Sequence, residues 1–142
     1  MRLSAYKKKS VVSAFKITPI YSLKESFFGY YDKNPCNGKG MVLFHSSDFD
    51  TSRPPGYAPY ININMLDELS GEVIWSSQSK AFNWQQGSRL QWITDEKFIY
   101  SDFDELDARY VSKVVNIKDY SVTQYRYPVQ DAYKDQYFLS LN

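Results

Sequence analysis

The stretch Asn83-Trp84-Gln85-Gln86-Gly87-Ser88-Arg89-Leu90-Gln91-Trp92 marks the point where a strand-and-turn pattern in this chain begins again. It places two tryptophans, three glutamines and one arginine beside a glycine. Aromatic side chains favour the half-buried, pleated surface of a sheet, while amide and guanidinium groups each offer several hydrogen bonds. We therefore predict that residues 84–92 form the first strand of a sheet and the approach to it.

A four-stranded unit is expected before this stretch. Short apolar runs at residues 27–32 and 41–46 predict two strands, and the segment between them is rich in Asn, Pro and Gly, which is typical of a turn. Adjacent prolines make residues 48–56 a loop. Residues 60–65 alternate apolar and polar side chains, which predicts a third strand with one face in water. A hairpin turn then leads to a fourth strand at 73–76.

The same order recurs after the stretch. A turn at 94–97 leads to predicted strands at 98–101, 109–117 and 122–127, and a further turn precedes a last strand at 137–142.

These patterns predict how the chain is divided. We expect a lead-in over residues 1–24, with a short strand at 10–17, followed by one sheet over 25–79, a second over 80–127 and the start of a third over 128–142.

Two recurring features indicate that the units are repeats. The tetrapeptide Ser-Asp-Phe-Asp occurs at 47–50 and at 101–104, and a polar turn followed by an apolar strand occurs at 37–44, 95–100 and 134–139. The offsets are roughly 54 and then roughly 40 residues, close to the length of one four-stranded blade. We therefore predict an all-β fold: four-stranded antiparallel blades of an incomplete β-propeller, with two blades and the start of a third.

An incomplete ring would leave blade faces open. A blade buries its two faces only against neighbouring blades, and propellers close with about four to eight of them. The chain is therefore expected to be the N-terminal part of a longer protein, with a ring completed by several copies as the alternative. In either case, open blade faces predict self-association or a protein partner.

Composition and charge disfavour several classes of function. The 142 residues carry a formal net charge of +1, and apart from Lys7-Lys8-Lys9, interpreted as a solvated terminal segment, the charges are scattered, so no nucleic-acid partner is expected. The chain shows neither a secretion signal nor a membrane-spanning stretch, which makes the cytoplasm the expected compartment and excludes a membrane partner. The single cysteine, Cys36, excludes an internal disulfide and precedes a turn sequence, so catalysis by its thiol is not expected.

Two strings resemble a known family. Residues 28–35, Phe-Gly-Tyr-Tyr-Asp-Lys-Asn-Pro, resemble the GYYDKxP opening of bacterial β-propeller proteins with TolB-like or oligogalacturonate-lyase-like blades, some of them associated with surface-polysaccharide genes. Residues 83–92 resemble the NWQQGxxLQW segment of the same proteins. The resemblance runs from about residue 22 to 142 and implies a propeller that continues through further blades. The lyase binds a divalent metal through several histidines, whereas this chain has only His45, so neither a metal site nor another cofactor is expected.

Candidate ligand-binding residues lie in the two predicted first strands, which would border the central channel of a propeller. Aromatic faces beside amides and carboxylates suit a sugar, whose C–H face stacks while its hydroxyl groups form hydrogen bonds. A guanidinium group can bind a carboxylate or phosphate through two parallel hydrogen bonds. The candidate set is Tyr30, Asp32, Trp84, Gln85, Gln86 and Arg89.

Each candidate has a structural alternative. Trp84 and Trp92 are also interpreted as packing between blades, and the adjacent glutamines as partners of backbone groups. Tyr30 and Asp32 share a face of the predicted strand, which leaves both an acid–base pair and a local hydrogen bond open. The two Asp-Phe-Asp elements are interpreted as turns rather than calcium ligands, and His45 as a satisfied, partly buried histidine rather than a ligand or base.

The sequence supports three functional hypotheses. The first is a glycan-related binding module of bacterial polysaccharide metabolism, with a carbohydrate ligand. The second is a fragment of a glycan-processing enzyme, a lyase or a glycosyltransferase-associated protein, whose catalytic residues lie on further blades. The third is a scaffold on which a protein partner docks. No catalytic residue is identified.

Overall fold

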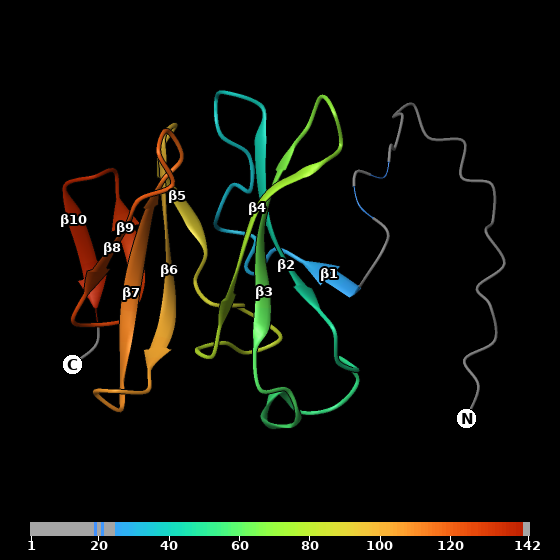
Figure 1. The fold of residues 1–142 in the computed structure, drawn as a ribbon, viewed down its shortest axis with the longest axis vertical. Helices are drawn as coiled ribbons and strands as arrows, with labels where there is room; N and C mark the ends of the chain where they lie inside the picture. Colours follow the sequence, from blue (N-terminus) through green and yellow to red (C-terminus); the bar gives the residue numbers. More distant parts are fainter. Residues whose placement is uncertain (1–18, 20, 22–24, 141–142) are drawn as a thin grey trace, which may run out of the picture.

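The computed structural model describes Pro19, Tyr21 and residues 25–140. Within this part of the chain, all regular structure is β apart from one 3-10 turn, η1 (Pro55–Tyr57), and the strands form three antiparallel sheets (Figure 1). The all-β expectation is confirmed. The strand expected at 10–17 lies outside the described residues. No helix among the described residues has the length and apolar character needed to cross a membrane.

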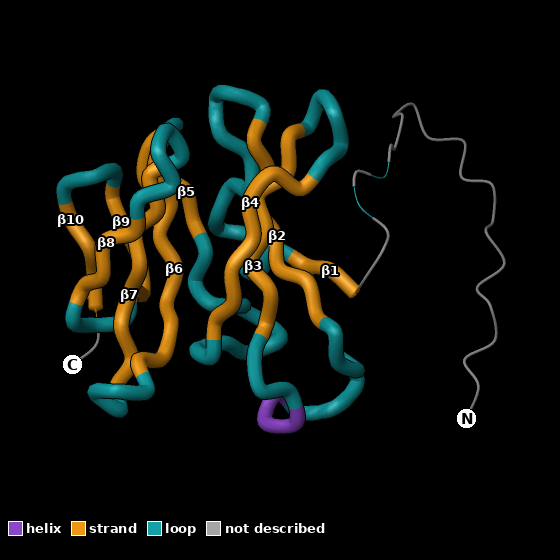
Figure 2. Tube along the Cα trace, viewed as in Figure 1, coloured by secondary structure: helices purple, strands orange, loops and turns teal. Residues whose placement is uncertain are grey.

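Sheets 1 and 2 each contain four strands in sequential order, and sheet 3 contains two. Sheet 1 consists of β1 (Glu25–Phe27), β2 (Met41–Ser47), β3 (Ile61–Asp67) and β4 (Val73–Ser79). Sheet 2 consists of β5 (Gln91–Thr94), β6 (Lys97–Asp104), β7 (Arg109–Asn116) and β8 (Val122–Tyr125). Sheet 3 consists of β9 (Val129–Tyr133) and β10 (Tyr137–Ser140). The longest connections precede β2, β3 and β5, as Figure 2 shows.

The three sheets share one hairpin register. In each sheet a residue before the turn pairs with the residue six positions later, and these pairs are Cys36–Val42, Trp92–Phe98 and Ala132–Phe138. The second residues of these pairs are separated by 56 positions (98 minus 42) and then 40 positions (138 minus 98). The recurring polar turn followed by an apolar strand is therefore the same hairpin, formed three times.

The repeated Ser-Asp-Phe-Asp tetrapeptide is not part of this structural repeat. The shared register places His45, and not Ser47, at the position of Ser101. Asp48 is exposed beyond the end of β2, whereas Asp102 is buried within β6. The turn role expected for both copies is therefore wrong for the second, because β6 and β7 remain paired over their whole length.

Each sheet has two faces, since successive side chains of a strand point to opposite sides. We call the face that holds Leu43, Ile99 or Leu139 the forward face, and the face that holds Val42, Phe98 or Phe138 the rear face.

The sheets are stacked in chain order with apolar layers between them (Figure 1). The forward face of sheet 1 packs on the rear face of sheet 2 through Leu43, Ile63, Met65, Leu90, Phe98, Tyr100 and Val115. The forward face of sheet 2 meets sheet 3 through Ile93, Ile99, Val114 and Val129, with Ala132 and Phe138 packed against them. Burial of these side chains is the main force that holds the sheets together.

Both expected first strands are shorter than the sequence pattern indicated. β1 ends at Phe27, so Tyr30 and Asp32 lie in the connection to β2 and do not share a strand face. Gly29 has φ of +134°, which takes the backbone out of the β region. β5 begins only at Gln91, and most of the stretch 84–92 is a turn and a connection.

One of the two asparagines of β3, Asn64, does not face water as the alternation predicted, whereas Asn62 is partly exposed. Asn64 is 5% exposed; its Nδ2 donates to Ser46 Oγ at 2.9 Å, and its Oδ1 accepts from Ser76 Oγ at 2.9 Å. This ladder across three strands satisfies the buried amide, which otherwise would be costly to bury. The rear face of sheet 1 is therefore apolar at Val42 and polar at Asn64.

Candidate functional site

A tight turn opens the connection from β4 to β5. The backbone N–H groups of Asn83 and Gly87 each donate to the other residue's carbonyl oxygen, at 3.3 and 2.9 Å. Asn83 Oδ1 also accepts from the backbone N–H groups of Gln85 and Gln86, at 3.0 and 2.7 Å. Asparagine favours such turns because its side chain replaces a backbone acceptor, and Gly87 supplies the φ of +57° that closes the turn. The turn fixes both glutamines ahead of β5.

This turn lies against the connection that follows β1. Gln85 Nε2 donates to Tyr30 Oη at 3.1 Å. A Cβ atom on Gly29 would lie 3.0 Å from the carbonyl oxygen of Gln86, so the two backbones approach as closely as a glycine allows. Three of the six candidate residues, Tyr30, Gln85 and Gln86, are therefore brought together by two connections far apart in the sequence.

A salt bridge ties sheet 3 to the same place. Lys33 Nζ donates to Asp131 Oδ1 at 2.6 Å and lies 3.5 Å from Asp32 Oδ2. The hydrogen bond from Lys33 holds the pKa of the Asp131 carboxyl below its usual value, and the charge of Arg89 acts in the same direction. Asp32 and Arg89 therefore join the cluster, which draws on segments that precede β2 and β5 and on β9 itself.

The cluster encloses only a very small hollow. Its lining consists of Phe28, Tyr30, Asp32, Lys33, Gln86, Arg89, Leu90 and Gln91, and its volume is about 10 Å³. Such a space is about that of one water molecule, so a sugar ring does not fit inside. A ligand of that size has to lie on the outside of the cluster, where Tyr31 is 93% exposed and its ring centroid lies 5.1 Å from that of Tyr30. We call the outer side formed by Tyr30, Tyr31, Asp32, Gln85 and Arg89 the polar surface.

Arg89 has an unusual backbone conformation within this cluster. Its φ is +59°, in the left-handed region, which costs a residue with a side chain about 1–2 kcal/mol. Strain of this kind often occurs at binding sites. Arg89 is half-buried and borders the hollow beside Gln86.

Trp84 lies apart from the other candidates. Its Nε1 donates to the carbonyl oxygen of Arg53 at 2.6 Å, and its ring contacts Phe27 edge-on at 6.2 Å between centroids and Phe82 at 5.2 Å. Its contacts are those of a packing residue that joins the loop after β2 to the turn before β5. Trp92 also packs, against Phe98 in the layer between sheets 1 and 2.

The polar surface and the salt bridge beside it contain residues that the sequence pattern did not single out. Lys33 follows Asp32 directly in the sequence, and its charge beside that carboxylate was the available signal. Tyr31 was expected on the opposite strand face from Tyr30, and the loss of the strand places the two rings side by side. Asp131 lies on β9, and no local pattern connects that position with Lys33, 98 residues away.

His45 and Ser88 form a buried polar pair beneath Gly87. His45 Nε2 accepts from the Ser88 backbone N–H at 3.2 Å and lies 2.9 Å from Ser88 Oγ. Because a backbone N–H only donates, Nε2 carries no proton and neutral His45 is protonated on Nδ1. The exposed fractions are 0% for His45 and 1% for Ser88. The pair resembles a nucleophile and its base, but no substrate reaches it. The expectation of a satisfied, partly buried histidine is corrected on both points, because the ring is fully buried and its Nδ1 has no hydrogen-bond partner among the described residues.

The charge state of His45 makes stability depend on pH. Burial lowers the pKa of His45 to about 4, against the opposing effect of the Phe28 and Phe27 backbone. The unfolded chain therefore binds a proton below a pH of about 6.5 that the folded chain does not bind until about 4. Stability should fall as pH drops through this window, by about 2 kcal/mol between pH 7.5 and 5. Urea unfolding at both pH values measures this loss.

A His45→Gln variant is the control for this prediction. Glutamine keeps an acceptor for the Ser88 N–H but does not titrate, and the chain has no other histidine. The variant should lose much less stability between pH 7.5 and 5 than the parent chain. An equal loss in both proteins would show that His45 is not the group responsible.

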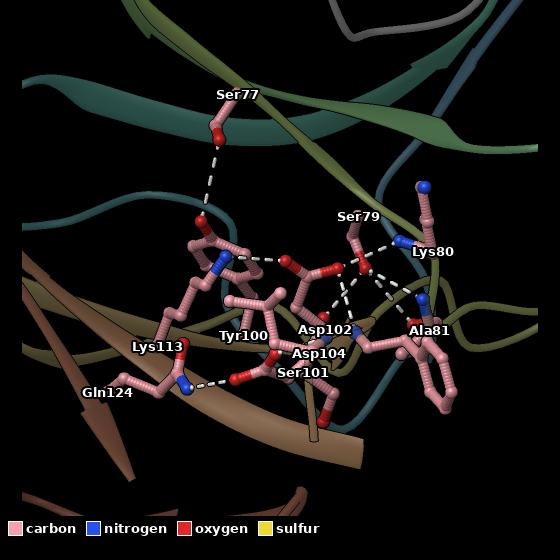
Figure 3. A network of polar contacts seen from close by, with 12 residues as sticks. Ser77, Ser79, Lys80, Ala81, Tyr100, Ser101, Asp102, Asp104, Lys113 and Gln124 are labelled. Atoms are coloured by element: carbon pink, nitrogen blue, oxygen red, sulfur yellow. Dashed lines mark hydrogen bonds and ion pairs between the residues drawn. The ribbon is translucent and has the colours of Figure 1, made fainter. Parts of the chain in front are cut away.

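A second polar network joins sheets 1 and 2 at the ends of β4 and β6 (Figure 3). The Asp102 carboxylate accepts from the backbone N–H of Lys80 at 2.9 Å and from Lys113 Nζ at 2.6 Å. Nearby, Ser79 Oγ donates to the Ser101 carbonyl oxygen at 2.7 Å. The polar side chains drawn in Figure 3 point toward one another and serve as one another's hydrogen-bond partners. We interpret this network as a joint between the sheets.

Two of the larger hollows on the surface are broad and open. One of about 650 Å³ includes Cys36, Trp92 and Lys134, and one of about 490 Å³ lies beside the Asp102 network. Burial, with a smaller effect of the Glu68 charge, raises the pKa of the Cys36 thiol. The thiol is therefore not activated as a nucleophile.

Among the residues that the structure describes, no three His, Cys, Asp or Glu side chains are grouped so that they could hold a metal ion. Searches of protein-family models, of curated proteins and of solved structures return no match to this chain. The function of the chain is therefore inferred from the geometry of the site and from the resemblance of residues 28–35 and 83–92.

Proposed function

We propose that the chain is part of a β-propeller and acts as a carbohydrate-binding module in bacterial polysaccharide metabolism, with the polar surface as its binding site. The exposed ring of Tyr31 beside Tyr30, next to the amide of Gln85 and the charged groups of Asp32 and Arg89, carries this proposal. The single cysteine supports a reducing compartment such as the cytoplasm.

Three features support the propeller. The strands of sheets 1 and 2 follow one another in sequence and pair antiparallel, as in propeller blades. The same hairpin register recurs in all three sheets, and apolar layers stack each sheet on the next. The family that residues 28–35 and 83–92 resemble has this fold.

The chemistry of the polar surface supports a sugar ligand. A sugar presents an apolar C–H face that stacks on an aromatic ring and hydroxyl groups that exchange hydrogen bonds. Tyr31 offers an exposed ring, while Gln85 and Asp32 are exposed polar groups beside it. Arg89, the cationic member of the surface, suits a sugar carboxylate. Acidic oligosaccharides are therefore the first ligands to test.

Binding should be lost when the ring or the cation of the polar surface is removed. We expect oligogalacturonate to bind the parent chain and Tyr31→Ala to weaken the affinity by about tenfold or more, since one stacked ring contributes about 1–2 kcal/mol. Arg89→Gly should also weaken binding of the acidic sugar, yet leave the fold at least as stable because glycine adopts φ of +59° without strain. Titration calorimetry and urea unfolding give the two readouts.

The matched control is Tyr120→Ala, which removes a partly exposed tyrosine from the turn between β7 and β8. This variant should bind as the parent chain does. A cello-oligosaccharide of equal length separates recognition of the acid group from recognition of the ring. If neither acidic nor neutral oligosaccharides bind the parent chain, the proposal is wrong, and it is equally wrong if Tyr31→Ala and Arg89→Gly both retain full affinity.

A further inference from the structure

The hollow of about 650 Å³, which we call the broad hollow, borders the polar surface. Asn34 and Trp92 line it, and the residues directly before them, Lys33 and Gln91, line the small hollow of the polar cluster. Consecutive Cα atoms lie only about 3.8 Å apart. Lys134, in the β9–β10 hairpin, completes this side of the broad hollow. The segments before β2 and β5 thus contribute to both places, and one extended ligand can contact both.

Trp92 offers the broad hollow an aromatic ring that is held in place. Its Nε1 donates to the Pro35 carbonyl oxygen at 2.8 Å, and its ring packs edge-on against Phe98 at 5.5 Å between centroids. The residue is nevertheless only partly buried, and it lines the hollow. A ring that is already fixed loses little freedom when a sugar lies against it. Trp92 therefore suits the C–H face of a sugar, as Tyr31 does on the polar surface.

Lys134 brings a positive charge to the same hollow. It is exposed, with its Nζ 5.4 Å from the centroid of the Tyr133 ring. None of the ion pairs formed among the described residues includes it. The acidic residue of the lining, Asp95, is engaged elsewhere, because its Oδ1 accepts from the Gly38 backbone N–H at 2.9 Å. The ammonium group of Lys134 is therefore available to a carboxylate of a ligand.

We propose that the broad hollow is a second subsite for the acidic oligosaccharide, in which one sugar unit stacks on Trp92 and pairs its carboxylate with Lys134 while another unit occupies the polar surface. This inference rests on the proposed function, because it extends the same ligand. A volume of about 650 Å³ lies within the range of ligand sites, about 300–1,000 Å³. Asn34 and Thr94 add exposed polar side chains for sugar hydroxyl groups. The preferred ligand is then an oligomer rather than a single sugar.

The length of the ligand tests the second subsite. We expect tetragalacturonate to bind the parent chain about tenfold more tightly than digalacturonate, since a second ring contact and a second charge pair add to the first. Lys134→Gln should reduce this gain to about threefold or less, because the charge pair is lost, and should leave the affinity for digalacturonate unchanged. Titration calorimetry measures both affinities.

The matched control is Arg126→Gln. Arg126 is also exposed and also lies over a neighbouring tyrosine, with its Cζ 5.7 Å from the centroid of the Tyr127 ring. It does not line the broad hollow. This variant removes one positive charge, as Lys134→Gln does, and should keep the full gain of tetragalacturonate over digalacturonate. An equal loss in both variants would show that only the overall charge of the chain matters and would overturn the second subsite.

Cys36 provides a readout that needs no substitution. It is the single cysteine of the chain, it is exposed, and it lines the broad hollow. Tetragalacturonate at about ten times its dissociation constant should slow the alkylation of Cys36 by iodoacetamide about tenfold, because only the unoccupied chain reacts. Digalacturonate at the same multiple of its own dissociation constant should leave the rate unchanged, since it occupies the polar surface.

The outcomes separate this inference from the proposed function. A gain that Lys134→Gln removes, together with protection of Cys36 by tetragalacturonate alone, supports the second subsite. If digalacturonate binds and Tyr31→Ala weakens it, but tetragalacturonate binds no more tightly or keeps its gain in Lys134→Gln, the second subsite is wrong and the proposed function stands. Failure of tetragalacturonate to protect Cys36, or equal protection by digalacturonate, also overturns the second subsite. If no acidic oligosaccharide binds, both proposals are wrong.

Discussion

A Gly87→Ala variant is expected to lose about 2–5 kcal/mol of its free energy of unfolding, which is a large part of the stability of a small domain. A Cβ atom at this position would lie within 2.6 Å of both ring nitrogens of His45. Overpacking of this kind costs about 1–3 kcal/mol, and the φ of +57° adds about 1–2 kcal/mol for a residue with a side chain. His45 is fully buried and bonded to Ser88, so its ring has little room to move.

Gly71 provides the matched control for this substitution. Its φ of +72° is also in the left-handed region, but a Cβ atom there would have no neighbour within 4 Å. Gly71→Ala should therefore cost only the conformational part, about 1–2 kcal/mol. Urea unfolding of both variants measures the difference. Equal losses would mean that contact with His45 does not constrain Gly87.

The sequence was most informative where strands are long and fully paired. β2 and β7 lie within a residue of their predicted bounds, because strand-length segments with several apolar side chains, bounded by turn residues, have few other solutions. The recurring hairpin was also readable, since its turn residues and the apolar strand after it are local features. β6 extends three residues farther than predicted, because its polar end is held by pairing with β7, which no local pattern reveals.

The first strands were harder to predict for a physical reason. Trp84, Gln85 and Gln86 carry side chains that also occur in strands, but the Asn83 side chain and Gly87 close a turn around them. The strand preference of these side chains competed with the turn preference of Asn83 and Gly87, and the local hydrogen bonds of Asn83 decided in favour of the turn. Tyr30 and Gln86 are still adjacent in space, although they do not lie on neighbouring strands.

The surroundings of the polar surface depended on long-range contacts. The Lys33–Asp131 pair joins residues 98 positions apart, and the contact of Gly87 with His45 joins the connection before β5 to β2. Neither contact can be recognised when the sequence is examined one segment at a time. What it did contain was the clustering of tyrosine, carboxylate, amide and arginine in two short strings, and these strings meet.

An Asp102→Ala variant is expected to lose about 3 kcal/mol of its free energy of unfolding. The side chain of Asp102 is 9% exposed, and the substitution leaves the Lys113 ammonium and the Lys80 backbone N–H without their acceptor. Breaking a buried pair costs about 3–5 kcal/mol. We expect a loss at the lower end of this range because the Lys113 side chain is 28% exposed and water reaches its ammonium group. No local pattern indicates this role, since Asp102 was interpreted as a turn residue.

Glu105 offers a control with the same geometry and different burial. Lys80 Nζ lies 2.6 Å from Glu105 Oε1, as Lys113 Nζ does from Asp102 Oδ2, but the Glu105 side chain is 69% exposed. Exposed pairs contribute about 0–1 kcal/mol, so Glu105→Ala should have a small effect. Adding Lys113→Met to Asp102→Ala should recover part of the loss, because the double variant no longer contains an unpaired ammonium. If both alanine variants cost the same, the two sheets are held together by their apolar layer alone, and the Asp102 network is incidental.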